Sequence, residues 1–280
     1  MDLADYRRES RETWRRMAAG WERELRWLWD VSRPVGESLV AMLNPQPGQT
    51  ILELAAGTGE TGFAAAARLG EYGKLISSDF AFEMVGAARR RADQLGLHNV
   101  EFRVMDAEQM DLEDDSVDGV LCRWGYMLMS DPAAALAETR RVLRKDGRLS
   151  FSVWSEAARN PWATVARRAL NEHGHLPAPA PGDPGVFSMA DRDRIQSLVT
   201  GAGFAAPRID EVEIEWSFDD IDAYWGFLAE LSGGLALVME QLDDGERAQV
   251  RATMVESAEP YRRDEGGYAF PGVALNAVAS

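Results

Sequence analysis

The sequence predicts an α/β fold in which helices cover both faces of a mostly parallel, doubly wound sheet. Between residues 50 and 154, short runs of aliphatic residues alternate with amphipathic helical segments. This alternation is the pattern of parallel strands joined by crossover helices. The chain has 280 residues, which is enough to bury a sizeable core around such a sheet. We therefore expect one large α/β domain with additional helices.

The amino-terminal segment predicts two helices. Between Tyr6 and about Leu28, apolar side chains recur every three or four residues, which places them on one helix face. Pro34 interrupts the pattern, and a second helix is expected over Val35–Leu43, before a turn-forming stretch at residues 44–48. We expect residues 1–45 to form a helical lid.

Residues 46–154 are expected to form the cofactor-binding core. The predicted strands are 50–54, 74–78, 100–105, 117–122 and 148–154, and the predicted helices are 60–69, 82–95 and 132–143. Asp146 and Gly147 predict a tight turn into the fifth strand.

The alternation changes after residue 154. A helix over 161–172, a proline-rich loop over 176–187 and a helix over 191–199 are expected, so residues 155–205 are interpreted as a helical and proline-rich substrate insertion. Residues 206–280 are expected to complete the same sheet, with a strand over 208–216, helices to about residue 261 and a last strand over 268–278.

Composition narrows the function classes. The 30 basic and 46 acidic residues give a formal charge of −16, which disfavours nucleic acid as a partner. The single cysteine, Cys122, excludes an internal disulfide and fits a reducing compartment. No signal-peptide core and no run of eighteen apolar residues is present. We expect a soluble, cytoplasmic protein without stable membrane insertion, and we leave a homo-oligomer open.

A glycine turn follows the first predicted strand. Gly57, Gly59 and Gly62 have the Gly-x-Gly-x-x-Gly spacing, and Asp79 lies 22 positions after the first of them. A dinucleotide site has this layout. However, Glu53 precedes the turn, Glu60 begins the next helix, and no basic residue stands between them. Carboxylates disfavour a pyrophosphate at a helix amino terminus, so the turn fits a cationic cofactor without phosphate better. S-adenosylmethionine, with its ammonium and sulfonium groups, is such a cofactor.

Acidic residues also follow the second and third predicted strands. Asp79 can accept both ribose hydroxyls of a nucleoside, and Asp106 can accept the adenine amino group, with Ala107 leaving room beside the ring. Open parallel sheets bind ligands at these carboxyl ends. By contrast, the acidic run around residues 111–115 is interpreted as a solvated loop without a role.

Taken together, these motifs resemble the class I S-adenosylmethionine-dependent methyltransferase family, specifically its small-molecule branch similar to the ubiquinone and menaquinone biosynthesis methyltransferases. The resemblance rests on Glu53–Gly59, on Ser78-Asp79 followed by Met84, on Asp106-Ala107, and on Arg123–Met127 leading to Asp131-Pro132. It implies a Rossmann-like sheet of seven strands with a reversed last strand. The cofactor contacts that it implies are Glu53, Ala55, Gly57, Thr58, Gly59, Asp79, Phe80, Met84, Asp106, Ala107 and Arg123.

The acceptor side is less defined. We expect Trp21, Trp124, Tyr126 and Met127 near the substrate, and we name Tyr126 and His173 as candidate catalytic residues. Because the sulfonium is already activated, a base is needed only for an acceptor that must lose a proton, and alignment of the reactants is the main requirement. No Cys/His cluster has the spacing of metal ligands, so no metal is expected.

Three hypotheses follow. The first is methyl transfer from S-adenosylmethionine, leaving S-adenosylhomocysteine, to an oxygen, nitrogen or carbon of a small-molecule acceptor, for which an aromatic or quinone-like natural product is one candidate. The second is an NAD(P)-dependent oxidoreductase, which the glycine spacing allows and which Glu53 and Asp106 disfavour. The third is a methyltransferase fold that binds the cofactor without transferring its methyl group.

Overall fold

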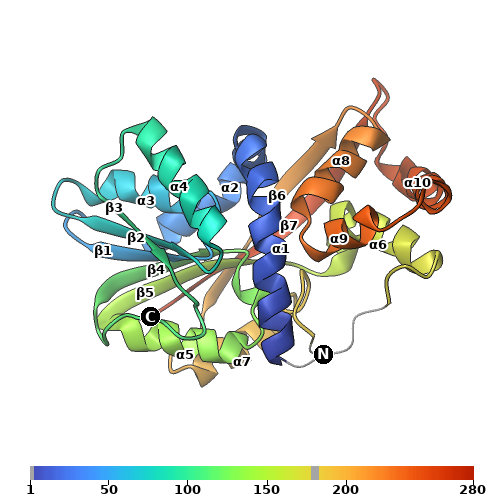
Figure 1. The fold of residues 1–280 in the computed structure, drawn as a ribbon. Helices are drawn as coiled ribbons and strands as arrows, with labels where there is room; N and C mark the ends of the chain where they lie inside the picture. The colour runs from blue at the N-terminus through green and yellow to red at the C-terminus, as the bar shows by residue number, and fades with distance from the viewer. Residues whose placement is uncertain (1–2, 178–182) are drawn as a thin grey trace.

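The computed structural model describes residues 3–177 and 183–280. Its centre is a seven-stranded sheet in the order β3-β2-β1-β4-β5-β7-β6 (Figure 1). The strands are β1 Thr50–Leu54, β2 Lys74–Asp79, β3 Val100–Val104, β4 Val117–Arg123, β5 Leu143–Trp154, β6 Arg208–Phe218 and β7 Tyr268–Ala279. Strands β1 to β5 pair in parallel, and β7 runs antiparallel to both β5 and β6. The predicted fold class, with its reversed last strand, is confirmed.

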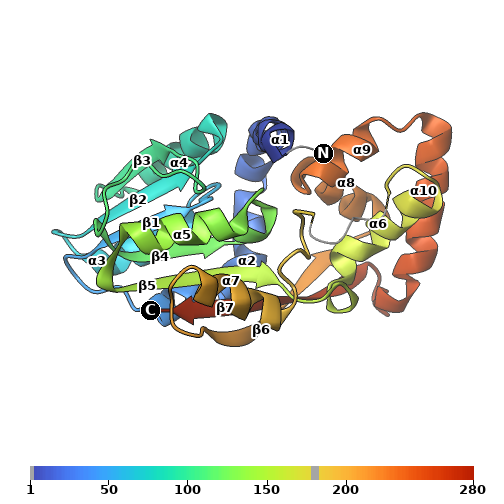
Figure 2. The same cartoon turned by 90° about the horizontal axis from the view of Figure 1, so that it is seen from below.

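Helices cover both faces of the sheet. The α-helices are α1 Leu3–Arg23, α2 Leu25–Leu43, α3 Glu60–Leu69, α4 Phe82–Leu95, α5 Pro132–Val142, α6 Pro161–Glu172, α7 Arg192–Gly201, α8 Ile221–Leu231, α9 Gly234–Glu240 and α10 Asp244–Ala258. On one face, Leu39 of α2, Phe63 of α3 and Ala88 of α4 pack against the strands. On the other face, α5 and α7 lie side by side (Figure 2). Because both faces are covered, the central strands are apolar on both sides, as in β1 with Ile51 and Leu52.

The predicted break between the first two helices was misplaced. The structure ends α1 at Arg23, and α2 continues through Pro34. A proline inside a helix removes one backbone hydrogen bond. Pro34 and Asp30, the residue whose carbonyl loses this bond, are both exposed, so water can satisfy that carbonyl and the helix continues.

The predicted turn at Asp146 and Gly147 lies within β5. Val117 pairs with Leu143, whereas Gly119 pairs with Arg148, so the additional residues form an irregularity in the strand pairing. The Asp-Gly signal therefore marks a β-bulge.

The remaining helices lie beyond the carboxyl ends of the strands. Helices α8, α9 and α10 connect β6 to β7 and gather with α6 at one side of the molecule (Figures 1 and 2). In contrast, α7, which had been expected in the insertion, packs on α5 as part of the sheet cover. Within the proline-rich loop, residues 178–182 lie outside the described residues. Helix α1 lies between α4 and α8, and contacts both (Figure 2).

Candidate functional site at the carboxyl ends of the strands

The glycine turn connects β1 to α3 through backbone conformations that side chains disfavour. Ala55, Gly57 and Gly59 have φ angles of 49°, 55° and 89°. A Cβ atom added to Gly57 would meet only the Trp21 ring of α1, at 3.9 Å. The predicted contacts Ala55, Gly57, Thr58 and Gly59 therefore lie together, and the Gly57 backbone faces α1 without packing against the core.

Glu53 lies beneath this turn. Its side chain is 2% exposed. It accepts hydrogen bonds from the Gly62 amide at 2.6 Å and the Ser77 hydroxyl at 3.2 Å. Burial raises the pKa of Glu53 to about 8. A Cβ atom on Gly62 would lie 2.2 Å from the carboxylate, so this glycine makes room for Glu53. Through these hydrogen bonds, Glu53 connects β1 and β2 to the start of α3.

The expectation that the turn lacks compensating cations is wrong. Glu60 pairs with Arg91 of α4 at 2.7 Å. The positive charge of Arg123 also acts on Glu53, where it opposes the rise in pKa. Neither partner was recognised, because each lies more than thirty positions away along the chain. The carboxylates of this turn are thus partly compensated, and the acidic side chains at the ends of β2 and β3 are the stronger indication of the site.

Asp79 ends β2 and holds the turn from the side. Its carboxylate accepts hydrogen bonds from the Gly57 amide and from the Ala81 amide, both at 3.0 Å. The side chain is 7% exposed, and burial raises its pKa to about 6. Phe80 follows in the turn before α4 and Met84 lies on α4, and both cluster with Met17 of α1. Three predicted cofactor contacts thus lie directly beneath α1.

Asp106 follows β3 and is already paired. One oxygen accepts the Glu108 amide at 2.9 Å, and the other pairs with Arg7 of α1 at 2.5 Å. Arg11, one turn further along α1, lies over the Phe80 ring at 5.6 Å. Helix α1 therefore reaches over both the Asp106 and the Gly57 ends of the site.

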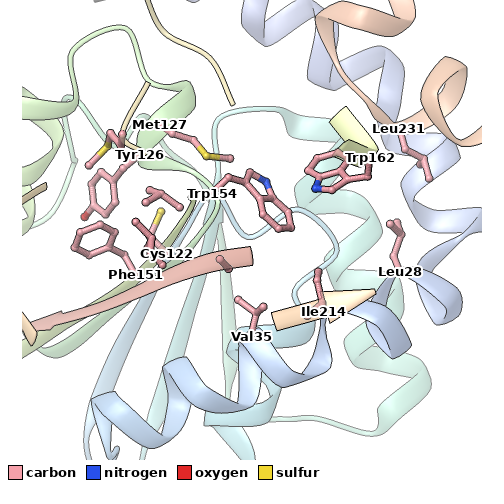
Figure 3. Close-up of a cluster of buried hydrophobic side chains, with 14 of the residues drawn as sticks. Leu28, Val35, Cys122, Tyr126, Met127, Phe151, Trp154, Trp162, Ile214 and Leu231 are labelled. Carbon is pink, nitrogen blue, oxygen red and sulfur yellow. The ribbon is translucent and has the colours of Figure 1, made fainter. Parts of the chain in front are cut away.

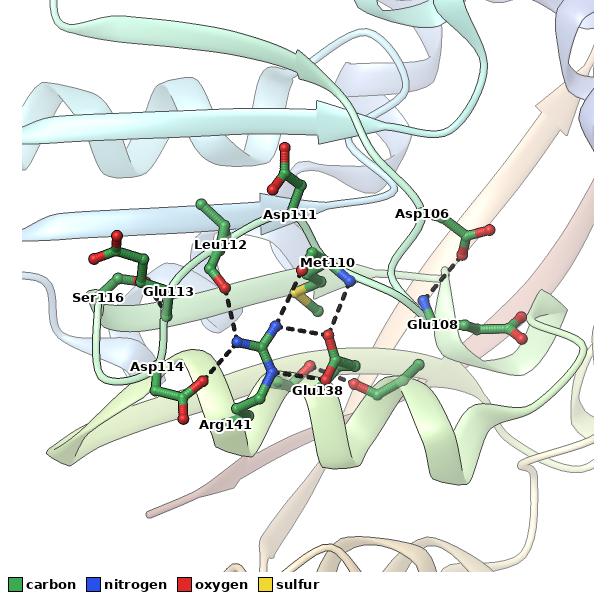
Figure 4. A network of polar contacts seen from close by, with 12 residues as sticks. Asp106, Glu108, Met110, Asp111, Leu112, Glu113, Asp114, Ser116, Glu138 and Arg141 are labelled. Atoms are coloured by element: carbon green, nitrogen blue, oxygen red, sulfur yellow. Dashed lines mark hydrogen bonds and ion pairs between the residues drawn. The ribbon is translucent and has the colours of Figure 1, made fainter.

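Arg141 of α5 fixes the loop that carries Asp106 and Ala107 (Figure 4). It donates to the carbonyls of Met110 and Leu112 at 3.0 and 2.7 Å, and it pairs with Glu138 at 2.7 Å. The acidic loop that was interpreted as merely solvated is thus attached to α5. The Glu138–Arg141 spacing of three residues within a helix was the available signal for a charge pair.

The end of β4 and the segment after it contain half-buried and core positions. Arg123 donates from Nε to Thr61 at 3.0 Å, and its guanidinium lies over the Trp124 ring at 4.6 Å. Tyr126 is 0% exposed, with its hydroxyl 2.6 Å from that of Thr139. Burial also raises the pKa of Tyr126 well above its usual value. Met127 is buried, and its carbonyl accepts from Gly185 and Ser188. Tyr126 therefore occupies a packing position that does not suit a catalytic hydroxyl.

Aromatic side chains extend the site beyond β4. Trp124 stacks on Trp154 of β5 with ring centroids 4.3 Å apart, and Trp154 contacts Trp162 of α6 at 4.8 Å. Figure 3 shows Trp154 and Trp162 side by side at the strand ends, away from Tyr126, which points toward Phe151. The cluster continues with Trp216, whose ring centroid lies 5.1 Å from that of Trp162. Trp27 follows, with its ring centroid 5.7 Å from that of Trp216. The tryptophans of β5, β6 and α6 were not predicted as site residues, since their spacing in sequence gives no sign of their proximity.

His173 lies apart from these residues. It follows α6, and its Nε2 atom is 2.9 Å from the Thr253 hydroxyl of α10. This contact joins the end of α6 to α10. His173, the candidate base, therefore faces α10 and not the glycine turn.

The described residues contain no group of three or more His, Cys, Asp or Glu side chains arranged to hold a metal ion. Among them, no helix is both long enough and apolar enough to span a membrane.

Comparisons with known proteins agree with this geometry. A family model described as "Methyltransferase domain" matches residues 45–189. A ubiquinone/menaquinone biosynthesis C-methyltransferase (UbiE) of Acidiphilium cryptum is 37% identical over 47% of this chain and 55% of its own length. The aklanonic acid methyltransferase DauC of a Streptomyces species is 33% identical over 42% of this chain and 54% of its own. The chain thus matches about half the length of these relatives.

The crystal structure of the YcgJ protein from Bacillus subtilis has a similar fold. It superposes with a TM-score of 0.59 at 19% identity, covering 87% of this chain and 96% of the other. The family model covers more than half of the chain and includes β1 to β5 with the glycine turn. The chain belongs to the methyltransferase domain family.

Proposed function

We propose that this protein binds S-adenosylmethionine at the carboxyl ends of β1 to β4 and transfers its methyl group to a small molecule. The observation that carries the proposal is the position of Asp79. Its buried carboxylate at the end of β2 is bonded to the Gly57 amide of the turn after β1. A ribose-binding acid and the glycine turn are therefore held in one fixed arrangement.

The residues fit this cofactor. The Asp79 carboxylate accepts the backbone amides of Gly57 and Ala81, and because a carboxylate has about four acceptor positions, it retains capacity for ribose hydroxyls. Asp106 likewise retains acceptor capacity for an adenine amino group beside the small Ala107. Thr58, Phe80 and Met84 would surround the nucleoside. Glu53 supports this binding indirectly, because it fixes the start of α3.

When bound, the cofactor supplies a methyl group on a sulfonium, which is an activated donor. The chain's own contribution is then to orient the acceptor and to exclude water. Helix α1 is suited to exclusion, since Trp21 lies over Gly57 and Arg7 pairs with Asp106. We propose that α1 is the lid of the site, whereas α2 belongs to the layer that covers the sheet.

The acceptor is proposed to be aromatic or quinone-like. Trp124 and Trp154 stack on each other where β4 and β5 end, and the half-buried Trp124 gives this end of the site an aromatic edge that a flat molecule can contact. The names of two relatives, which refer to aklanonic acid and to ubiquinone/menaquinone biosynthesis, agree with such an acceptor. A protein base is not part of the proposal, since Tyr126 is buried in the core and His173 contacts α10.

Methyl transfer from radiolabelled S-adenosylmethionine to a panel of phenols, quinones, amines and carboxylic acids tests this function. We expect label to pass to a phenol, quinone or aromatic acid, and Asp79→Ala to weaken S-adenosylhomocysteine binding at least tenfold. Asp111→Ala, an exposed carboxylate of the loop after β3, is the matched control. Unchanged cofactor affinity in Asp79→Ala would refute the ribose assignment. Transfer only to aliphatic amines would refute the aromatic acceptor.

A further inference from the structure

We propose that the Glu108–Ser130 pair couples cofactor binding at Asp106 to the position of residues 185–190. We call residues 185–190 the acceptor-side loop, because they belong to the segment expected to form the substrate insertion. Glu108 and Ser130 are positioning residues in this inference, since neither needs to touch the cofactor or the acceptor. The inference rests on the proposed function and describes how one end of the site prepares the other.

Glu108 connects the turn after β3 to the loop after β4. Its backbone amide donates to the Asp106 carboxylate at 2.9 Å (Figure 4). Its side chain is 7% exposed, and one carboxylate oxygen accepts the Ser130 amide at 2.8 Å. The Ser130 hydroxyl lies 2.8 and 2.7 Å from the two carboxylate oxygens. Because hydrogen bonds to a carboxylate are stronger than those between neutral groups, this pair holds the two loops together.

The acceptor-side loop is attached to the same segment. The carbonyl of Met127, three positions before Ser130, accepts the Gly185 amide at 2.9 Å and the Ser188 hydroxyl at 2.7 Å. The two residues between these contacts pack against the hydrophobic core that includes Trp154. Because one carbonyl holds both contacts, the position of Met127 determines that of the acceptor-side loop.

Helix α1 contacts both of the connected loops. Arg7 pairs with Asp106 at 2.5 Å and lies 3.8 Å from the Glu108 carboxylate. The neighbouring Tyr6 donates its hydroxyl to the Leu128 carbonyl at 2.9 Å. Burial raises the pKa of Tyr6 to about 12, so this hydroxyl keeps its proton at neutral pH. Two consecutive residues of the proposed lid thus bridge the turn after β3 and the loop after β4.

These contacts give cofactor binding a route to the acceptor side. An adenine amino group on Asp106 would restrain the turn that carries Glu108. Restraint of Glu108 makes local opening at Ser130 and at the Met127 carbonyl less frequent, and the amides of the acceptor-side loop open less often in turn. Such coupling is reciprocal in binding free energy, so an acceptor held by this loop would also strengthen cofactor binding.

Hydrogen–deuterium exchange of the full chain, followed at the Gly185 amide with and without saturating S-adenosylhomocysteine, tests the coupling. We expect S-adenosylhomocysteine to slow exchange at Gly185 about fivefold or more. Ser130→Ala removes the hydroxyl contact with Glu108. It should reduce this slowing to less than about twofold, while the affinity for S-adenosylhomocysteine stays within about threefold.

Ser116→Ala is the matched control. The Ser116 hydroxyl donates to the Glu113 carbonyl at 2.7 Å, just before β4 and away from Glu108. This variant should keep the full slowing at Gly185. Ser130→Thr, which retains a hydroxyl, should restore most of the slowing that Ser130→Ala loses. If Ser130→Ala folds poorly, Ser188→Ala provides a second readout, because it removes one of the two contacts to Met127 and should also reduce the slowing.

The outcomes separate the two proposals. If the unmodified protein does not bind S-adenosylhomocysteine, the proposed function fails, and this inference fails with it. If the protein binds S-adenosylhomocysteine but exchange at Gly185 is unchanged, only the coupling is overturned. If the full slowing persists in Ser130→Ala, the ligand shields the acceptor-side loop directly, and the role of the Glu108–Ser130 pair is overturned.

Discussion

Replacing Glu53 with glutamine should change how the stability of the protein depends on pH. Burial raises the pKa of Glu53 to about 8 in the folded state, against 4.5 for the free side chain. The folded state therefore binds a proton that the unfolded state has lost. Stability from this group is fully present below pH 4.5 and is lost as the pH rises through 8. Glutamine keeps an oxygen that can accept the Gly62 amide, and it does not titrate.

The magnitude follows from the same pKa values. The slope is about 1.4 kcal/mol per pH unit while the folded state alone holds the proton. Between pH 6 and 8, which lies above the raised pKa of Asp79 at about 6, the contribution of Glu53 falls by about 2 kcal/mol. Glu53→Gln should lack this fall and should be the more stable protein at pH 8.

Urea unfolding at half-unit pH steps from 6 to 8 measures the difference. Glu37→Gln, on an exposed position of α2, is the control and should follow the unmodified protein. Parallel stability curves for Glu53→Gln and the unmodified protein would refute the reasoning, since they would mean that Glu53 titrates below this range.

Three further predictions concern the turn, the core and α1. Ala55→Gly should stabilise the protein by about 0.5–1 kcal/mol, because glycine adopts the φ angle of 49° without strain, and a lower free energy of urea unfolding would contradict this. Tyr126→Phe should cost about 1 kcal/mol of stability through the lost contact with Thr139, while S-adenosylhomocysteine affinity stays within twofold. A tenfold loss of S-adenosylhomocysteine affinity would contradict this and would indicate that Tyr126 contributes to cofactor binding. Arg7→Gln should raise the dissociation rate of S-adenosylhomocysteine several-fold in stopped-flow measurements and reduce its salt dependence, since it removes the Arg7–Asp106 pair. Arg8→Gln, which removes a pair with Asp5 inside α1, should change neither the dissociation rate nor its salt dependence. Equal dissociation rates for the two variants would refute the proposal that the Arg7–Asp106 pair holds α1 over the site.

The sheet was predictable from sequence because its signals are local. The aliphatic residues Ile51, Leu52 and Leu54 and the glycine turn after them can be recognised from neighbouring residues alone. The errors arose where distant residues decide the outcome. Pro34 continues a helix because its exposed side tolerates the lost bond, and the Asp146-Gly147 turn became a bulge because the pairing with β4 extends to Leu143.

The site shows the same division. The positions of Asp79 and Asp106 follow from strand ends, which sequence reveals. The arginines that hold the site cannot be recognised in this way. Arg7 pairs with Asp106, Arg91 pairs with Glu60, and Arg141 binds the loop after β3, and each comes from an element far away along the chain. Tyr126 was predicted from its place after β4, but the direction of its side chain depends on α5, which supplies Thr139.

The central claim is that the glycine turn and Asp79 bind S-adenosylmethionine. Calorimetric titration of the unmodified protein with S-adenosylhomocysteine and, separately, with NADH tests it most directly. We predict saturable one-to-one binding of S-adenosylhomocysteine and no binding of NADH. Binding of NADH without binding of S-adenosylhomocysteine would contradict the account.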